Sequence, residues 1–335
     1  MEKDHQPERT SDLRSLSPRS RRATLRRSPG RVYPRRMHSE TVTVPDGRTL
    51  ALEIAGDPDG KPVLAHMGTP NSRHIYEANA FDAHSRGIKL ISYDRPGYGG
   101  STPQPGRRIA DCAADVRAIC DALSIERLGI WGISGGGPHA LACAALLPDL
   151  VAGVASLASL APFGADGLDY FEGMGEDNEV DFKLALEDPE AAREKLEQER
   201  LKYLELPPEG LKDALRTLLT PTDAAVLDGP LAAYLSWSEH EGLAPGGQGW
   251  WDDGHAFTED WGFDLSDIAV PVLLLHGRED MFVPFGHGRW LAEHIPGVQA
   301  RLLDNDGHLT LLTNRVGEVH EWLLAQAGLS VVVPE

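Results

Sequence analysis

The segment GIWGISGGGPHA, residues 129–140, places one serine, Ser134, among five glycines. Apolar residues before it favour a strand and small residues after it favour a helix, so we predict a strand, a tight turn and a helix. Residues 132–136 match G-x-S-x-G, in which glycines remove side chains that would clash in the turn and leave the serine exposed as a nucleophile. The alternative is that Ser134 only caps the helix.

Apolar runs alternate with helical patterns on both sides of this segment. Residues 41–56 read as a β-hairpin with Asp46-Gly47 at its turn. The other predicted strands are KPVLAH (61–66), IKLISYD (88–94), RLGIWG (127–132), LVAGVASLAS (150–159), VPVLLLHG (270–277) and VQARLLD (298–304). Such apolar strands between helices predict an α/β fold with a mostly parallel central sheet flanked by helices.

The alternation stops between about residues 162 and 262, where the sequence is helical and acidic. We therefore predict a core of residues 37–161 and 263–335, with a helical cap, residues 162–262, inserted after the sixth strand. Residues 1–36 are rich in Arg, Ser and Pro and are expected to form a disordered basic tail. Met37 begins the regular pattern, and we favour the hypothesis that the native product starts there and that the tail has no role in catalysis.

The 335-residue chain has a formal net charge of −19 that is unevenly distributed. Residues 1–36 hold eleven cationic side chains and four acidic ones, a net +7, which leaves −26 for the rest. A body this acidic is expected to repel nucleic acid. No segment approaches the roughly 18 apolar residues that a membrane span needs, and the N-terminus lacks the apolar region of a secretory signal. We expect a cytoplasmic protein whose partner is a small-molecule substrate, and the sequence specifies no oligomeric state.

The sequence contains none of the motifs that hold metals or nucleotide cofactors. Its histidines are scattered, no HExxH or CxxC occurs, and GxGxxG and GxxxxGK[ST] are absent. The three cysteines, Cys112, Cys120 and Cys143, lie in helical patterns and are expected to be buried thiols. We therefore expect no metal and no cofactor.

Five segments typical of one family follow one another along the chain: HMGTPNSR (66–73), DRPGYGGS (94–101), GISGG (132–136), GREDMFVP (277–284) and DNDGHLT (304–310). Together they resemble the α/β-hydrolase family of serine hydrolases with a helical cap, and the resemblance covers roughly residues 40–330. It implies that Ser134, Asp280 and His308 form the catalytic triad, in the chain order that this fold uses. His308 would take the serine proton, and Asp280 would hold the imidazole in place.

Other side chains compete for the roles of acid and base. For the acid these are Glu279, next to Asp280, and Asp166 or Asp169 after the sixth strand. Six other histidines are given other roles: His276 and His139 structural, His287 and His294 on the surface, and His240 and His255 in the cap, where they could contact substrate.

The resemblance also places an oxyanion hole beside Ser134. One donor would be the backbone N–H of Gly135 and the other that of Thr69, in a loop where Met67 stands in place of the family's usual histidine. That substitution makes Met67 a candidate for the substrate pocket. Of the cap aromatics Tyr234, Trp237, Trp250, Trp251 and Trp261, we single out Trp237 and Trp251 for the pocket.

The expected activity is hydrolysis of a small or medium carboxylic ester through an acyl-enzyme intermediate. A prolyl-type aminopeptidase is one alternative, because cap carboxylates could hold a substrate ammonium. It is disfavoured because GISGGG replaces the tryptophan-containing elbow of those enzymes, and the oxyanion loop lacks their double glycine. C–C bond hydrolase, lactonase or perhydrolase activity would use the same triad. A non-catalytic ligand-binding protein is the remaining alternative.

Overall fold

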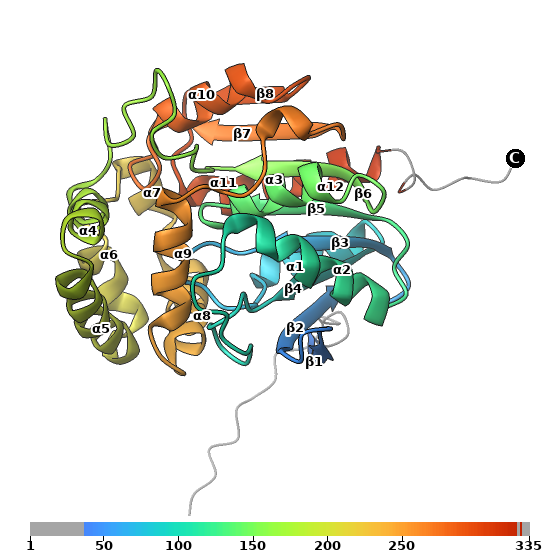
Figure 1. The fold of residues 1–335 in the computed structure, drawn as a ribbon, viewed down its shortest axis with the longest axis horizontal. Helices are drawn as coiled ribbons and strands as arrows, with labels where there is room; N and C mark the ends of the chain where they lie inside the picture. Colours follow the sequence, from blue (N-terminus) through green and yellow to red (C-terminus); the bar gives the residue numbers. More distant parts are fainter. Residues whose placement is uncertain (1–36, 327–328, 330–335) are drawn as a thin grey trace, which may run out of the picture. The chain divides into compact units, whose positions relative to one another are not determined.

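The computed structural model describes residues 37–326 and residue 329, so the predicted basic tail, residues 1–36, lies outside the described residues. The strands are β1 (His38–Thr43), β2 (Thr49–Gly56), β3 (Lys61–His66), β4 (Ile88–Tyr93), β5 (Leu128–Ile133), β6 (Val151–Leu157), β7 (Val272–Gly277) and β8 (Gln299–Leu303). Among the described residues they form one sheet, in the order β1-β2-β4-β3-β5-β6-β7-β8 (Figure 1).

The sheet is antiparallel at one edge and parallel over the rest of its width. β2 pairs antiparallel with β1 and β4, whereas all neighbours from β4 to β8 are parallel. Gly47 has a φ of 89° at the turn of the predicted hairpin, a left-handed conformation that glycine adopts without strain. Every residue of the inner strands β5, β6 and β7 is buried, which explains their continuous apolar sequences.

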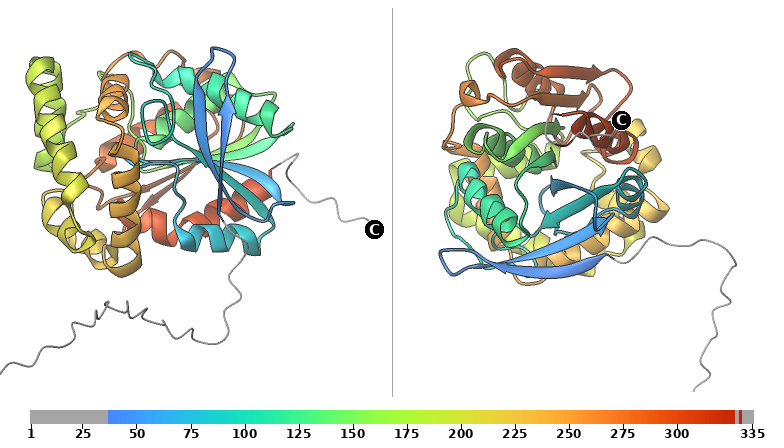
Figure 2. Two further views of the ribbon diagram at one scale, coloured as in Figure 1. Left: turned by 90° about the horizontal axis from the view of Figure 1, so that it is seen from below. Right: turned by 90° about the vertical axis from the view of Figure 1, so that its right-hand side faces the viewer.

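Helices cover both faces of this sheet. Those outside the inserted segment are α1 (Glu77–Ser85), α2 (Cys112–Ala122), α3 (Gly136–Leu146), α10 (Phe285–His294), α11 (Leu309–Asn314) and α12 (Val316–Leu324). Helices α2, α3 and α10 contribute to the apolar core on one face, and α1, α11 and α12 to the core on the other. Figure 2 shows these two layers on either side of the strands. The fold is therefore the predicted α/β sandwich.

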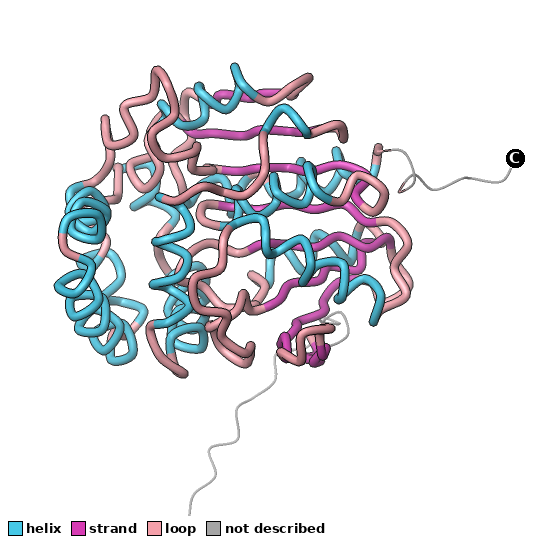
Figure 3. The backbone as a smooth tube through the Cα atoms, viewed as in Figure 1, coloured by secondary structure: helices cyan, strands magenta, loops and turns pink. Residues whose placement is uncertain are grey.

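A further set of helices interrupts the chain between β6 and β7. We call these the inserted helices: α4 (Glu176–Glu187), α5 (Pro189–Glu205), α6 (Leu211–Ala214), α7 (Pro221–Val226), α8 (Gly229–Leu243) and α9 (Gln248–Thr258). Figures 1 and 3 show them beyond the carboxyl ends of the parallel strands, with the connecting loops in between. Ligands of open α/β sheets bind at this end of the strands, so the inserted helices and the loops enclose the expected position of a site.

Within residues 37–326, every helix is too short or too polar to cross a lipid bilayer.

Candidate active site

Ser134 lies at the turn between β5 and α3. Its φ of 54° is left-handed, a conformation that a residue with a side chain rarely adopts. The turn is held by two backbone hydrogen bonds, from Ser134 N to Leu157 O (2.9 Å) and from Gly137 N to Ser134 O (2.8 Å). A Cβ atom on Gly132 would lie 2.2 Å from Gly136 O, and one on Gly136 would lie 2.1 Å from His66 O. Both glycines are thus required for the strained, tight turn that the G-x-S-x-G pattern predicts.

His308 and Asp280 are joined by a hydrogen bond at the other side of the site. His308 Nδ1 donates to Asp280 Oδ2 at 2.8 Å. The other carboxylate oxygen accepts two backbone N–H groups, from Phe282 and Val283, each at 2.9 Å. The Phe282 ring stacks on the imidazole with 4.6 Å between centroids. Asp280 is therefore fixed by the loop after β7, and it fixes the tautomer of His308 in turn.

The environment of His308 stabilises its protonated form. Burial lowers the pKa of the imidazole, but the charge and hydrogen bond of Asp280, with a further contribution from the charge of Asp223, outweigh burial and raise the pKa above its ordinary value of 6.5. A histidine that is easily protonated within the site suits a base that must hold a proton transiently.

Ser134 and His308 line the same cavity. Both side chains are described, and no hydrogen bond joins them in this structure. Nucleophile–base hydrogen bonds are often long before substrate binds, so this geometry is compatible with the pair acting together.

Asp223, from the inserted helix α7, is a site residue that sequence reasoning missed. Its carboxylate is fully buried and accepts the backbone N–H groups of His308 (2.8 Å), Leu309 (2.8 Å) and Thr310 (3.1 Å). It therefore caps α11 and holds the backbone on which His308 is carried. The only local signal in the sequence was the helix-start pattern Thr220-Pro221 before Asp223. It predicts a helix, but it does not predict that Asp223 bonds to His308, 85 residues away.

The structure separates the competing acids from His308. The Glu279 carboxylate accepts a hydrogen bond from Thr222 Oγ1. Asp166 and Asp169 are exposed: the Asp166 carbonyl accepts Trp290 Nε1, and the Asp169 side chain accepts a local backbone N–H. Of the four acids weighed from the sequence, Asp280 is the one that bonds to His308.

The competing histidines are mostly structural. His276 Nε2 donates to Val283 O (2.9 Å), and His139 Nδ1 donates to Gly135 O (2.8 Å). The expectation that His287 lies on the surface is wrong: it is fully buried, accepts Ala161 N and donates to Tyr170 O. Amphipathic spacing could not reveal this, because the loop after β6 covers that face of α10. His255 lines the cavity.

The loop that carries Thr69 packs directly against the turn of Ser134. A Cβ atom on Gly135 would lie 2.3 Å from Thr69 Oγ1, so the two residues are in close contact. In the described part of the chain, neither the backbone N–H of Thr69 nor that of Gly135 donates a hydrogen bond to a protein atom. Two free amides on neighbouring residues beside a serine can serve a developing oxyanion.

A buried ion network supports this loop from behind. Arg95 donates to Met67 O (2.5 Å) and to Thr69 Oγ1 (3.0 Å), and pairs with Asp253 of α9 at 2.5 Å. Asp253 also accepts Arg107 (2.5 Å) and Thr69 Oγ1 (2.6 Å). Burial raises the pKa of Asp253, but the two arginines outweigh it and hold the pKa well below its usual range. The inserted helix α9 is thus tied by charge to the loop beside Ser134.

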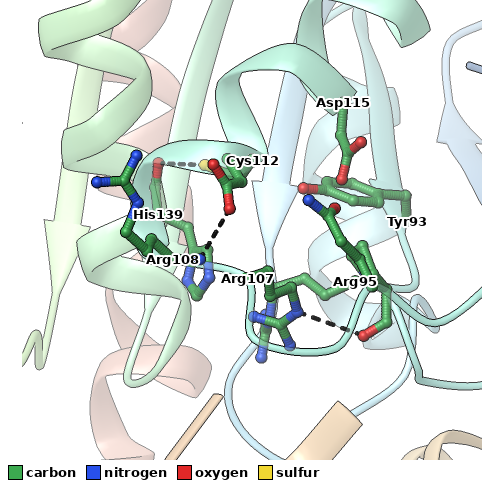
Figure 4. A pocket seen from close by; sticks show the side chains of 10 residues that line it. Tyr93, Arg95, Arg107, Arg108, Cys112, Asp115 and His139 are labelled. Carbon is green, nitrogen blue, oxygen red and sulfur yellow. Dashed lines mark hydrogen bonds between the residues drawn. The ribbon is translucent and has the colours of Figure 1, made fainter. Parts of the chain in front are cut away.

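Figure 4 shows Arg95, Arg107 and His139 around a second, much smaller cavity of about 10 Å³ behind this network. It has room for about one water molecule. Its size excludes it as a substrate site.

The cavity at Ser134 has a volume of about 400 Å³, in the range of sites for small ligands. Its walls come from the loops at Thr69, Ser134 and His308 and from α4, α5, α8 and α9. Of the predicted pocket residues, Trp251 lines it.

The other two predicted pocket residues, Met67 and Trp237, lie elsewhere. Met67 is 3% exposed and packs in the core, with its sulfur 3.8 Å from Tyr234 Oη. Trp237 is 45% exposed and stacks on His74 with 3.7 Å between centroids. The position of Trp237 follows from the rotation of α8. This helix turns Leu235 and Glu239 toward the cavity, so Trp237 projects from another face.

His66, Cys112 and Cys143 are the described residues whose ligand atoms cluster as a metal site would require, all within 4.8 Å of one another. The cluster is completely buried, and burial raises the pKa of Cys112 well above its ordinary value. Burial likewise lowers the pKa of His66, and the charges of His139 and Arg95 add to the effect. A protonated thiol at Cys112 beside a cation does not suit a metal, so the two cysteines fit buried core thiols better.

The similarities to known proteins agree with this architecture. The sequence profile of the family described as alpha/beta hydrolase fold matches residues 61–315. A non-heme chloroperoxidase of Streptomyces lividans is 29% identical over 252 residues, covering 73% of this chain and 83% of that protein. A bifunctional esterase/perhydrolase of Acinetobacter calcoaceticus is 25% identical over 247 residues, covering 73% and 83%. The crystal structure of a bromoperoxidase from Bacillus anthracis superposes with a TM-score of 0.64 at 23% identity, covering 86% of this chain and 98% of that one.

With a profile match over most of its length, the chain belongs to the α/β hydrolase fold family and is a hydrolase.

Proposed function

We propose that the protein hydrolyses small or medium carboxylic esters, with Ser134, His308 and Asp280 as its catalytic triad. His308 removes the proton of Ser134 Oγ as the oxygen attacks the ester carbonyl. The N–H groups of Gly135 and Thr69 stabilise the oxyanion of the tetrahedral intermediate. The intermediate collapses when the C–O bond to the alcohol breaks, and His308 gives its proton to the departing alkoxide.

The second half of the reaction repeats these roles with water. His308 takes a proton from water as the hydroxide attacks the acyl-enzyme carbonyl, and returns it to Ser134 Oγ as the carboxylic acid leaves. Asp280 stabilises the imidazolium through its hydrogen bond to Nδ1 in both halves.

The observation that carries the proposal is the 2.8 Å bond from Asp280 to His308, because His308 lines the same cavity as Ser134. A strained serine, a carboxylate-bound histidine and two free amides at one end of a 400 Å³ cavity are the parts that acyl transfer requires.

Labelling with a fluorophosphonate tests the proposal. The full chain and Ser134→Ala are treated in parallel and analysed by intact mass and peptide mapping. A single adduct on Ser134, absent from the variant, together with turnover of p-nitrophenyl esters, supports it. A folded protein that takes no label and cleaves no ester contradicts it, and faster cleavage of aminoacyl anilides than of esters favours the aminopeptidase alternative.

A second candidate activity is perhydrolysis, favoured by relatives named as a chloroperoxidase and an esterase/perhydrolase. Here hydrogen peroxide replaces water as the attacker of the acyl-enzyme, so that the products are a peroxycarboxylic acid and free Ser134. Bromination of monochlorodimedone in acetate, bromide and hydrogen peroxide measures it. Loss of that signal in Ser134→Ala would assign it to the same site, and a signal equal to the no-enzyme control would exclude it.

A further inference from the structure

Glu239, on α8, is a buried carboxyl group in the wall of the cavity. The residue is 7% exposed and lines the cavity together with Leu235, one helical turn before it. Among the described residues, no side chain or backbone group donates a hydrogen bond to the carboxyl group of Glu239 or forms an ion pair with it. Burial of a carboxyl group without a partner lowers the stability of a protein, so such a group calls for a functional explanation.

Aromatic side chains line the same cavity as this carboxyl group. Tyr203 of α5 lines the cavity and lies close enough to Glu239 for the carboxylate charge to contribute to raising the tyrosine pKa, after the larger effect of burial. The Tyr203 ring packs edge-to-face on Trp250 of α9, with 5.8 Å between centroids. Trp250 also lines the cavity, whereas the face of Trp251 is already covered by the guanidinium of Arg193, at 4.4 Å.

The charges along the cavity wall are predominantly negative. Lys195 is the one lysine or arginine among the described residues that line the cavity, and it already pairs with both Asp181 and Glu199. Glu239 has no such partner. A substrate that carried a carboxylate here would meet acidic groups without a free cation to receive it.

We propose that Glu239, Tyr203 and Trp250 form a subsite for a cationic group of the substrate, an ammonium or quaternary ammonium. A carboxylate supplies the opposite charge, and aromatic faces attract cations through their quadrupole. This inference rests on the proposed function, because it names the class of ester that the site takes: one with a positively charged acyl or alcohol group.

Burial gives the subsite a pH dependence of known sign. It raises the pKa of Glu239 to about 8, so at neutral pH the free enzyme holds this carboxyl group mostly protonated. A cation therefore binds with release of that proton to solvent, and binding tightens as the pH rises toward 8. Tyr203 of α5 and Tyr234 of α8 are the tyrosines on which the charge of Glu239 acts. The other charged groups around them are Glu199, Asp181 and Asp177 from α5 and α4, Lys195, which pairs with Asp181 and Glu199, and Glu53 of β2. Both tyrosines have raised pKa values and stay neutral throughout this range.

The test compares cationic esters with neutral esters of the same shape. One series consists of p-nitrophenyl esters of ω-trimethylammonio-alkanoic acids of increasing length, each beside its ω-tert-butyl analogue. A second series consists of acetates of ω-trimethylammonio-alkanols beside their tert-butyl analogues, followed by pH-stat. The measured quantity is the ratio of kcat/KM for the cationic and neutral members, in which the titration of His308 cancels.

We expect this ratio to exceed about 10 at one chain length in one series and to rise between pH 6 and pH 8.5. Glu239→Gln should lower the ratio at least tenfold, since it removes the charge and keeps the shape. Glu241→Gln is the matched control: it lies on the same helix, its side chain is 45% exposed, and it does not line the cavity. It should leave the ratio unchanged.

A ratio near 1 at every length in both series, or a ratio that Glu239→Gln does not alter, overturns the subsite. Failure of the proposed function gives a different result, namely that no ester of either kind is cleaved and no fluorophosphonate adduct forms. In that case calorimetric titration of Ser134→Ala with alkyltrimethylammonium ions decides the subsite independently: binding lost in the additional Glu239→Gln variant supports it, and no binding overturns it.

Discussion

Ser134 combines a strained backbone with a side chain that has no hydrogen-bond partner within residues 37–326. Its left-handed φ is maintained because Gly132 and Gly136 let the chain pass where any larger residue would collide with a carbonyl oxygen. The surrounding residues hold the turn, so the strain is retained in the folded protein. At this scale the proposed chemistry depends on the contact between His308 and Asp280, and on the cavity that His308 shares with the serine.

We expect Ser134→Ala and His308→Ala each to lower kcat/KM for a p-nitrophenyl ester by roughly 10⁴–10⁶-fold. The double variant should lose little more, because the two residues act as one unit. Steady-state kinetics of the three variants, with circular dichroism to confirm folding, measures this. Losses that add in the double variant would show that the two side chains act independently.

Glu239 should make the stability of the protein fall as the pH rises. Its pKa is raised from 4.5 to about 8 by burial, so the folded state binds a proton that the unfolded state has lost between those values. The stabilising effect of the neutral form is complete below about pH 4.5 and is lost as pH rises through 8. The free energy of unfolding of Glu239→Gln minus that of wild type should therefore be larger at pH 9 than at pH 5, by a few kcal/mol.

Urea unfolding of wild type, Glu239→Gln and Glu241→Gln at both pH values measures this effect. An equal difference between wild type and Glu239→Gln at pH 5 and pH 9 would contradict it. Glu241→Gln controls for the loss of a charge on the same helix outside the cavity.

At the scale of elements, the inserted helix α7 supports the loop that carries His308. Asp223 reaches from α7 to three successive N–H groups at the start of α11, and its charge contributes to the raised pKa of His308. A helix outside the sheet thereby contributes to both the position and the titration of the base.

The acid limb of kcat/KM should accordingly have its midpoint above pH 6.5, since His308 must be neutral to act as base and its pKa is raised. Asp223→Asn removes one of the charges that raise the pKa, so the midpoint should move to lower pH. The plateau of kcat/KM should fall roughly 10- to 100-fold, because Asp223 no longer holds the backbone at His308 in place. A pH profile of each protein between pH 4.5 and 9 provides the measurement.

Asp304→Asn is the control for this pH profile. Asp304 lies on the loop that carries His308, but its side chain is 73% exposed and pairs with Arg278. A midpoint that Asp223→Asn leaves in place, or moves upward, would show that Asp223 does not act on the histidine electrostatically.

For the whole molecule, the Arg95–Asp253–Arg107 network joins the inserted helices to the loops at the carboxyl ends of the strands. All three side chains are 3% exposed or less. The arginines come from loops after β4, and Asp253 comes from α9, more than 140 residues further along the chain. Docking of α9 therefore also sets the position of the Thr69 loop.

Asp253→Asn should lower the free energy of unfolding by roughly 3–5 kcal/mol, because it leaves two buried guanidinium groups without their counter-charge. The wild-type contribution is fully present at neutral pH, since the pKa of Asp253 is depressed and the group is ionised. Urea unfolding at pH 7 measures it. Asp260→Asn, an exposed acid 3.9 Å from Arg108, should change stability little, and equal effects of both substitutions would refute the network's role.

The sequence was sufficient for the features that local rules govern. Apolar strands alternating with helices identify a parallel sheet, G-x-S-x-G requires a tight turn at Ser134, and the chain order of serine, acid and histidine selects Asp280 and His308 as candidates. These follow because each depends on residues within a few positions, or on a resemblance carried by short motifs.

The tertiary structure decided which distant side chains meet. Met67 and Trp237 do not line the cavity, and His287 is buried. Asp223, Asp253 and Glu239 acquire their environments from elements far apart in the sequence. The physical reason is that burial, charge pairing and helix rotation are properties of packed elements. A carboxyl group in an acidic helix has the same local pattern whether it faces solvent, caps another helix or lines the cavity, and only the packing of the inserted helices on the sheet distinguishes these cases.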